Sequence, residues 1–405
     1  MLFGYTIDQQ LDKRPQHVQF CRRCVVSNQR PRITLDADGI CSACRYAEEK
    51  HHGIDWTARE KALWALCDRH RSNNGSWDVV VPGSGGKDSF YVALRLKERY
   101  GMHPLCVTWA PFEYTEVGWR NFMAWNQQLD ILPFFPRRDH HRKLALASFE
   151  LLGDPWQPFT YGQKSYAMHV ALKYGIPLVF YGESGEIEYG GSTKNKERPF
   201  EGPEDWDALY FKGAGINELL GHCIQAGMFT KKEAAAGFEF YRPPARVDLE
   251  RLGIQMHWMS YYDKWIPQEN YYFASRYGFE ANDERSEGTF TKYASLDDKQ
   301  DGFHFFLAYM KYGICRATSD TAHEVRDGHI QRDEAVALVR RYDGEFPAKY
   351  FRWFIDYLGI TESEFWEVVE FYHGLSPHLW EKTEKGWKLL HTVWGEQKGI
   401  EWRAE

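Results

Sequence analysis

Along the first half of the chain, short apolar runs alternate with segments in which apolar residues recur at helical spacing. The β-branched run at 78–82 is typical of a strand buried on both faces, and residues 88–100 follow it with a helical pattern. Parallel strands need a crossover between them, so this alternation predicts an α/β fold with a doubly wound parallel sheet. Strands are expected at 78–82, 103–109, 131–135 and 177–181, and helices at 56–70, 88–100, 117–129, 140–152 and 163–174.

The pattern changes beyond residue 182. It becomes irregular there and rich in glycine, lysine and aromatic residues, so we expect a long, substrate-facing insertion. After Asp301 the helical spacing returns and predicts a helical C-terminal domain. These helices are expected at 302–312, 318–326, 331–342, 347–357, 361–372 and 376–383.

Three units follow from these patterns. Residues 1–55 are a small N-terminal module, and 56–240 form the sheet domain. Residues 241–405 carry the substrate-facing segment and the helical C-terminal domain.

Composition and charge narrow the possible classes of protein. The chain has 405 residues, of which 43% are hydrophobic, and a formal charge of −7. An acidic balance gives no overall field that attracts a polyanion, so nucleic acid is a disfavoured partner. No apolar run is long enough to span a membrane and the N-terminus lacks a signal-peptide pattern, so we expect a cytoplasmic protein.

Four of the eight cysteines form two close pairs near the N-terminus. Cys21 and Cys24 make one Cys-x2-Cys pair, Cys41 and Cys44 make the other, and sixteen residues separate the pairs. This spacing is typical of a zinc ribbon, in which two knuckles bring four thiolates to tetrahedral corners. Because sulfur fills every position, a bound Zn²⁺ would be structural; an iron–sulfur cluster or redox-active dithiols remain alternatives.

A glycine-rich segment follows the expected strand at 78–82 and opens the next helix. Its sequence, GSGGKDS at 83–89, places glycines where the backbone must pass close to an anion, and it adds hydroxyls and a positive charge. The spacing Gly-x4-Gly-Lys-Ser/Thr of a Walker loop is absent, so ordinary γ-phosphate transfer is not expected. The segment instead predicts a site for pyrophosphate.

The segment 84–89 resembles the Ser-Gly-Gly-x-Asp-Ser loop of the PP-loop, or N-type, ATP pyrophosphatase superfamily. The resemblance implies that a substrate oxygen attacks the α-phosphorus of ATP, that pyrophosphate leaves, and that Mg²⁺ assists. Lys87, Asp88 and Glu183 are then the candidate catalytic residues, and Asp297 and Asp298 are further acids that could bind metal or transfer protons. The candidate ATP-binding residues are Ser84, Gly85, Gly86, Lys87, Asp88, Ser89, Thr108 and Gly182.

A zinc ribbon ahead of such a loop is similar to two families. These are the N-acetyl sugar amidotransferases of bacterial surface-polysaccharide synthesis and certain tRNA-thiolating enzymes. Resemblance to the first family extends over most of the chain, although 183–186 departs from the Glu-Asn-Pro expected there. The resembling blocks are 108–111, 114–115, 118–122, 181–183, 188–191, 288–293, 296–299, 316–320, 328–330 and 342–347.

Resemblance to the sugar amidotransferases implies a specific reaction. The enzyme would use ATP to convert an N-acetyl group of a nucleotide-activated sugar into an acetamidino group, in LPS O-antigen or surface-glycan synthesis. Lys292 and Arg316 are expected to bind the carboxylate or the phosphates of that sugar nucleotide. Because 221–225 lacks the second glycine of a glutaminase elbow, ammonia is expected from partners similar to glutaminase and cyclase subunits.

Two other functions remain open on the sequence. A PP-loop tRNA thiolase would need catalytic cysteines near the nucleotide, whereas Cys106, Cys223 and Cys315 are isolated along the chain. A non-catalytic scaffold would bind ATP without releasing pyrophosphate. The motifs do not encode the sugar, its nucleotide carrier or the oligomeric state.

Overall fold

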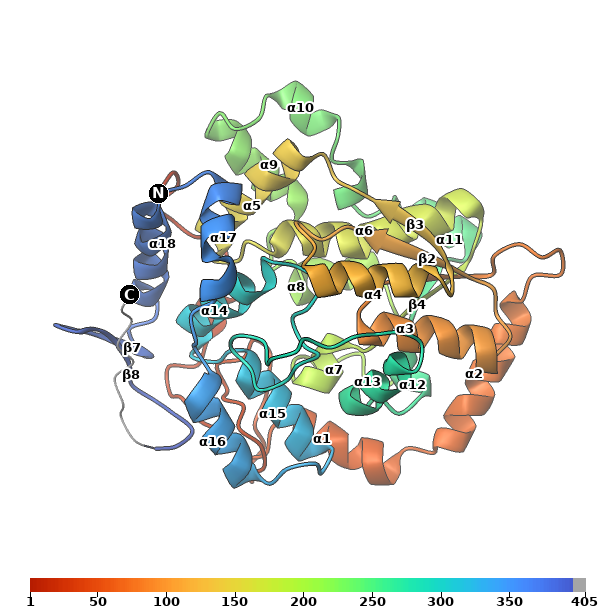
Figure 1. The fold of residues 1–405 in the computed structure, drawn as a ribbon, viewed down its shortest axis with the longest axis horizontal. Helices are drawn as coiled ribbons and strands as arrows, with labels where there is room; N and C mark the ends of the chain where they lie inside the picture. Colours follow the sequence, from red (N-terminus) through yellow and green to blue (C-terminus); the bar gives the residue numbers. More distant parts are fainter. Residues whose placement is uncertain (396–405) are drawn as a thin grey trace.

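A mixed, mostly parallel sheet of six strands runs through the protein, whose computed structural model describes residues 1–395 (Figure 1). The strand order is β3-β2-β1-β4-β6-β5. The predicted strands are present, each with its ends within one residue of expectation. They are β1 (Val79–Pro82), β2 (Pro104–Trp109), β3 (Asp130–Phe134) and β4 (Leu178–Tyr181). The predicted fold class is therefore confirmed.

The order of the strands reverses at β1: β2 and β3 lie on one side of it, and the later strands lie on the other. Strand β1 pairs in parallel with β2 on one side and with β4 on the other. In open parallel sheets, the carboxyl ends of the strands at such a switch point leave a crevice where ligands bind. The sequence 83–89 comes directly after β1, so the glycine-rich segment lies at this crevice.

Side chains of β1 point alternately into two hydrophobic layers. Val79 and Val81 pack in one layer with residues of α2, α3 and α4, whereas Val80 packs in the other with residues of α5 and α6. A strand buried on both faces has this alternation, which explains its continuous apolar run. The flanking helices are α2 (Trp56–His70), α3 (Lys87–Leu94), α4 (Glu116–Asn126), α5 (Arg138–Leu152) and α6 (Gln157–Tyr174).

The long, partly irregular insertion expected beyond residue 182 contains two strands of the sheet. Strand β6 (Gln255–Trp258) pairs in parallel with β4, and β5 (Phe200–Glu201) pairs antiparallel with β6. The sequence Gln-Met-His-Trp of β6 has no β-branched residue, so its strand character comes from its place beside β4. Residues 276–300 do lack helices and named strands, as expected.

Short helices occupy much of the same region. They are α7 (Gly185–Tyr189), α8 (Pro203–Leu209), α9 (Ile216–Gln225), α10 (Lys231–Ala235), α11 (Arg246–Leu252), α12 (Met259–Tyr262) and α13 (Pro267–Ser275). Strand β6 lies within the predicted unit 241–405 but completes the sheet of the unit 56–240.

The C-terminal part is helical, apart from one hairpin. The expected helix at 376–383 is wrong, because β7 (Trp380–Thr383) pairs antiparallel with β8 (Gly386–Leu389) around a turn in which Gly386 has a φ of 118°. Residues 396–405 of the predicted third unit lie outside the described residues. The helices are α14 (Asp301–Tyr312), α15 (Arg316–Arg326), α16 (Arg332–Tyr342), α17 (Phe351–Leu358) and α18 (Glu362–Gly374).

The N-terminus of the chain lies beside α18 (Figure 1). The N-terminal ammonium group of Met1 forms an ion pair of 3.0 Å with Glu367 of α18. Within residues 1–395, no helix combines the length and the apolar character needed to cross a membrane.

A buried ion pair joins the N-terminal module to two distant segments. Lys50, just after α1 (Ser42–Glu48), places its Nζ 3.1 Å from Glu188 of α7 and 3.2 Å from Asp327, which follows α15. The Lys50 side chain is 2% exposed, and its Nζ also donates to the Trp265 carbonyl oxygen at 2.9 Å. Because these charges are buried, each is stable only while its partner of opposite charge is present.

Replacing Lys50 with methionine should strongly destabilise the fold, because it leaves the carboxylates of Glu188 and Asp327 buried without their cation. We expect the free energy of unfolding, measured by urea titration, to fall by about 3–5 kcal/mol. As a control, Arg352→Met removes an exposed pair with Asp356 and should leave the midpoint nearly unchanged. Equal effects of the two variants would contradict this account.

Candidate functional site

The four cysteines of the N-terminal module meet at one buried point. Their sulfur atoms all lie within 4.8 Å of one another, and every one of these residues is fully buried. The Sγ atoms of Cys21 and Cys44 are 3.8 Å apart, and those of Cys24 and Cys41 are 3.7 Å apart. Tetrahedral zinc with Zn–S bonds of about 2.3 Å needs sulfur atoms about 3.8 Å apart, so the residues fit a structural zinc ion.

Backbone groups support this sulfur cluster. The N–H groups of Arg23, Cys24 and Cys41 point at the Cys21 sulfur from 3.4, 3.5 and 3.3 Å. Such contacts spread the negative charge that the thiolates would carry in a metal complex. Arg332 of α16 donates from Nε to the Cys24 carbonyl oxygen at 3.1 Å, so the C-terminal helices hold the module from outside.

The purified protein should contain about one zinc ion per chain by elemental mass spectrometry. The variant Cys41→Ser removes one of four ligands and should lose most of that metal, because the remaining three thiolates leave the tetrahedron open. The variant Cys223→Ala changes a buried cysteine on α9, outside the cluster, and should retain the metal. Iron with acid-labile sulfide would instead establish the iron–sulfur alternative.

The glycine-rich segment forms a tight turn between β1 and α3. Gly85 has a φ of 88°, and a Cβ atom there would lie 2.7 Å from the Phe122 backbone, so only glycine fits. Gly86 is the N-cap of α3, which begins at Lys87. The turn thus directs backbone N–H groups of a helix N-terminus toward the crevice, an arrangement that favours anions.

Side chains of the turn are paired among themselves and with distant residues. Lys87 places its Nζ 2.5 Å from the Asp88 carboxylate, whose other oxygen accepts a hydrogen bond of 3.1 Å from Asn270 of α13. Ser84 donates from its hydroxyl to the Asp297 carboxylate. No local sequence pattern marks Asn270, because its contact with Asp88 depends on how α13 packs against α3.

Two further predicted residues support the turn from behind. Ser89 donates from its hydroxyl to the Gly86 carbonyl oxygen at 2.7 Å. The hydroxyl of Thr108 in β2 donates to the Gly83 carbonyl oxygen, also at 2.7 Å. Gly182 follows β4, and a Cβ atom there would lie 2.7 Å from the Trp265 ring. These contacts fix the backbone of the crevice and leave Lys87 and the N–H groups as its charged and polar lining.

Glu183 lies at the carboxyl end of β4 and interacts electrostatically with charged residues of the glycine-rich turn. Burial raises the pKa of Glu183 to about 7, and the negative charge of Asp88 adds to this effect while Lys87 opposes it. A carboxyl group with a pKa near neutrality can take up or release a proton under physiological conditions. Glu183, Asp88 and Lys87 are therefore close enough to influence one another electrostatically.

Lys164 of α6 is a buried cation that the sequence analysis missed. Its Nζ lies 4.8, 3.8 and 4.5 Å from the ring centroids of Tyr181, Tyr210 and Trp258. Burial lowers the pKa of Lys164 to about 8, although the carboxylates of Glu201, Glu183 and Glu186 oppose the shift. A lysine within a helical pattern ordinarily faces water, so the sequence held no sign of this position.

The two predicted substrate-binding residues lie in different surroundings. Arg316, at the start of α15, is 3.1 Å from Asp320, and its guanidinium lies 4.7 Å from the Phe305 ring centroid. Lys292 is exposed and donates from Nζ to the Asp283 carbonyl oxygen at 2.5 Å. Arg316 interacts electrostatically with Tyr189, which also interacts with Glu183, so it lies near the crevice.

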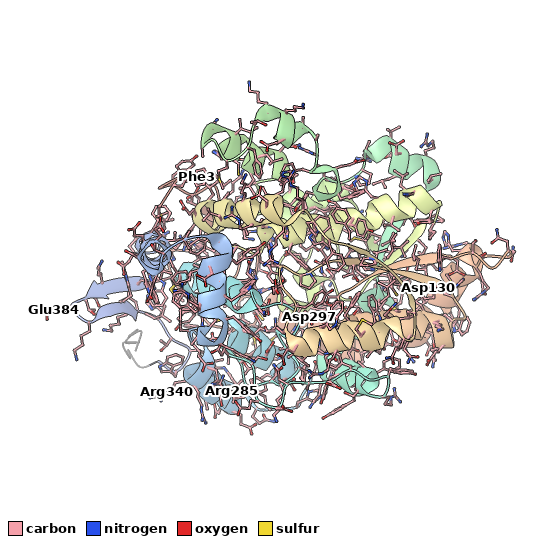
Figure 2. All side chains as sticks on the ribbon, turned by 45° about the horizontal axis from the view of Figure 1, so that its top comes forward. Phe3, Asp130, Arg285, Asp297, Arg340 and Glu384 are labelled. Atoms are coloured by element: carbon pink, nitrogen blue, oxygen red, sulfur yellow. The ribbon has the colours of Figure 1, made fainter. Side chains whose placement is uncertain are left out.

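Asp297, labelled near the middle of Figure 2, is half-buried, and the next residue, Asp298, is buried. Burial raises the pKa of Asp297 to about 6, and it raises that of Asp298 well above its ordinary value. Thr115, the N-cap of α4, donates from its backbone N–H to the Asp297 carbonyl oxygen at 3.2 Å. The segment around these acids therefore bridges the turn after β1 and the start of α4.

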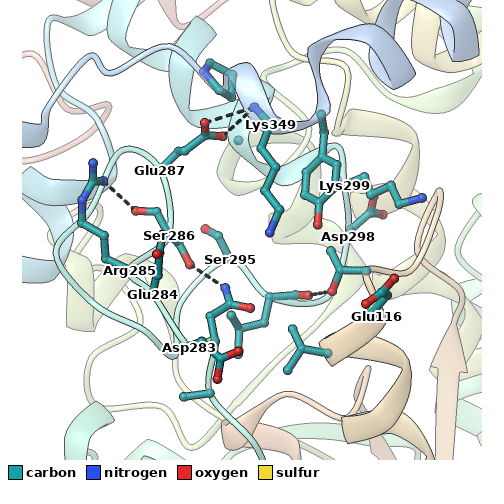
Figure 3. Close-up of a pocket in the computed structure, with 18 of the residues that line it drawn as sticks. Glu116, Asp283, Glu284, Arg285, Ser286, Glu287, Ser295, Asp298, Lys299 and Lys349 are labelled. Carbon is teal, nitrogen blue, oxygen red and sulfur yellow. Dashed lines mark hydrogen bonds between the residues drawn. The ribbon is translucent and has the colours of Figure 1, made fainter.

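A cavity of 940 Å³ opens beyond this acidic segment (Figure 3). Asp298 lies in its wall, and charged residues of 283–287 line another side. Glu287 accepts hydrogen bonds from the Lys349 backbone N–H, and Arg285 forms a double ion pair with Glu345 at 2.6 Å. None of the predicted ATP-binding residues lines this cavity.

Comparison with known families bears on the C-terminal part of the chain. Residues 287–393 match the family model described as "LPS biosynthesis protein WbpG-like, C-terminal domain". This part of the chain is WbpG-like. No match was found among curated proteins. The WbpG-like domain contains Asp297, which bonds to Ser84, and Arg316, so it contributes side chains to the surroundings of the glycine-rich turn.

The shifted pKa of Glu183 predicts how the stability of the protein depends on pH. Between the unfolded pKa of about 4.3 and the folded pKa of about 7, the folded protein binds the extra proton. The free energy of unfolding should therefore fall as pH rises through this window. In urea titrations, the free energy of unfolding of the variant Glu183→Gln should decrease less between pH 5 and pH 8 than that of the wild type. The control variant Glu197→Gln changes an exposed residue and should show the same decrease as the wild type. Parallel curves for wild type and Glu183→Gln would contradict the assignment.

Proposed function

We propose that the protein is an ATP-dependent amidotransferase of lipopolysaccharide or surface-glycan synthesis, which converts an N-acetyl group of a nucleotide-activated sugar into an acetamidino group. The observation that carries the proposal is the turn 83–89 at the switch point of the sheet, with Lys87, Asp88 and Glu183 in one electrostatic environment. The match of 287–393 to a WbpG-like domain of LPS biosynthesis supports the biological setting.

The proposed reaction has two steps. The amide oxygen of the substrate attacks the α-phosphorus of ATP, the bond to pyrophosphate breaks, and an O-adenylyl imidate forms. Ammonia then adds to the imidate carbon, AMP leaves with the former amide oxygen, and the acetamidino group remains. Adenylation is required because an amide carbonyl is a weak electrophile with a poor leaving group, and positioning of the reactants contributes further to the rate.

Residues of the crevice would serve this chemistry in distinct ways. The N–H groups at the start of α3 and the ammonium group of Lys87 would stabilise the departing pyrophosphate, together with Mg²⁺. Asp88 would lose its present pairing with Lys87 when ATP binds. Glu183, with its pKa of about 7, is suited to accept the proton that ammonia releases when it adds.

Ammonia has to be supplied to this crevice. The chain carries no glutaminase elbow, so we propose that subunits similar to a glutaminase and a cyclase deliver it. A sulfur-transferring function has less support, because burial raises the pKa of the thiols of Cys106, Cys223 and Cys315 and keeps them protonated.

The proposal is tested by incubating the purified protein with ATP, ammonium and diacetamido sugar nucleotides. We expect AMP and pyrophosphate to form only with a sugar, and mass spectrometry to show that an oxygen of the sugar is replaced by an imino group. AMP that forms only with tRNA and sulfide would establish a thiolase instead. ATP binding without pyrophosphate release under any condition would establish a scaffold.

The variant Lys87→Ala should reduce the rate of pyrophosphate release by about 10²–10³-fold, because it removes the cation that stabilises the leaving group. The fold should persist, since the ammonium group of Lys87 donates its hydrogen bond to the carboxylate of the adjacent residue, Asp88. Lys97→Ala removes an exposed lysine that bonds to the Gln128 carbonyl oxygen and serves as the matched control. Normal turnover by Lys87→Ala would exclude the role given to the turn.

A further inference from the structure

A second cavity, of 370 Å³, lies between the N-terminal module and helices α7, α14 and α15. Gly185 and Glu186 form part of its wall, and only Ser184 separates them from Glu183 along the chain. Arg30 of the N-terminal module and Ser319 of α15 line it as well. The wall of the cavity therefore includes the segment that follows the carboxyl end of β4.

Three of the four lysine and arginine side chains in this wall have a carboxylate partner. Arg32 binds the Glu186 carboxylate with two hydrogen bonds of 2.8 and 2.6 Å. Lys212 lies 2.6 Å from Asp154, and Lys311 lies 3.0 Å from Asp8. These pairs neutralise one another, so they leave little charge for a ligand.

Arg30 is the fourth of these cations and differs from the others. Its Nε donates to the Gly190 carbonyl oxygen at 2.7 Å, which fixes the plane of the guanidinium group. Among residues 1–395, its two terminal nitrogens have no hydrogen-bond acceptor and no ion-pair partner. Arg30 is half-buried in the cavity wall; burial lowers its pKa, and the carboxylate of Glu186, which Arg32 already binds, opposes that shift. Such a group gains most from a planar oxyanion that accepts two hydrogen bonds.

Arg30 also lies close to the proposed catalytic residues. Its guanidinium carbon is 5.7 Å from the centroid of the Tyr189 ring, and Tyr189 interacts electrostatically with Glu183 and Asp88. A ligand bound at Arg30 would thus extend from the cavity toward the crevice. Thr160 and Ser319 add hydroxyl groups to the wall, and hydroxyls can bond to a sugar ring.

We propose that this cavity binds the oxyanion of an acidic acetamido sugar, with Arg30 as the residue that receives it. The inference rests on the proposed function and adds a specificity determinant to it. A volume of 370 Å³ is at the lower end of ligand sites and accommodates one sugar ring. The oxyanion can be the carboxylate of the sugar or the diphosphate of its carrier, and the experiment separates these sources.

Calorimetric titration of the protein with three probes tests the site without turnover. The probes are a uridine-diphosphate-linked acetamido uronic acid, the corresponding neutral acetamido sugar nucleotide, and the acetamido uronic acid without a nucleotide. If Arg30 binds the sugar carboxylate, Arg30→Gln should weaken the binding of both acidic probes by about 10–100-fold. The affinity for the neutral sugar nucleotide should not change. If Arg30→Gln weakens the binding of the two nucleotide-linked probes equally and leaves that of the free uronic acid unchanged, Arg30 binds the diphosphate. Unchanged affinity for every probe would overturn the proposal.

A second pair of variants keeps the test valid if Arg30→Gln misfolds. Ser319→Glu places a carboxylate in the same cavity, and Ser319→Gln introduces a side chain of similar size without charge. We expect the acidic probes to bind more weakly to Ser319→Glu than to Ser319→Gln, whereas equal affinities would count against the site. Arg246→Gln, an exposed change on α11, is the charge control.

Failure of this inference and failure of the proposed function give different results. If wild type forms the acetamidino product but Arg30→Gln keeps its KM for the acidic sugar, the cavity assignment is wrong and the function stands. If no sugar is converted but the acidic probes bind through Arg30, the cavity assignment stands and the reaction is wrong. Unaltered metal content and thermal unfolding midpoints verify that each variant is folded.

Discussion

The cluster of four cysteine sulfurs is the constraint on which the position of the N-terminal module depends. Residues 21–50 are too few to bury a core of their own, so a metal ion at the sulfurs is what can give this segment a fixed shape. Once fixed, the module presents Arg32 to Glu186 and Lys50 to Glu188. The metal site therefore acts on the segment that follows β4, although its own ligands lie far from that segment along the chain.

The position of Glu183 follows from this arrangement. The segment after β4 is held at Glu186 and Glu188, and Gly190 lies so close to the module that a Cβ atom there would be 2.9 Å from Ile33. Held in this way, the carboxyl end of β4 cannot move independently of the N-terminal module. Strand β1 and its turn are held from the other side, where the WbpG-like domain supplies Asp297 to Ser84. The crevice thus lies at the ends of two paired strands, each held from outside the sheet by a different part of the chain.

Two polar side chains of the glycine-rich turn are already paired within the protein. Ser84 is bonded to Asp297, and Lys87 is bonded to Asp88. A phosphate group offers the same kind of acceptor as these carboxylates, so ATP would exchange partners with them and would not have to fill an unsatisfied site. The raised pKa of Asp297, about 6, shows that burial already disfavours its charge and lowers the cost of that exchange.

The sequence by itself determined the features that are encoded over a few neighbouring residues. The two cysteine pairs, the turn 83–89 and the alternation of strands and helices from α2 to β4 were all predicted, because ligand spacing, glycine positions and apolar periodicity are local properties. Only the tertiary structure decided that Gln255–Trp258 is a strand, that Asn270 bonds to Asp88, and that Arg30 has no anionic partner. These features depend on neighbours distant in sequence, which set burial, charge pairing and strand contacts, and no local pattern carries that information.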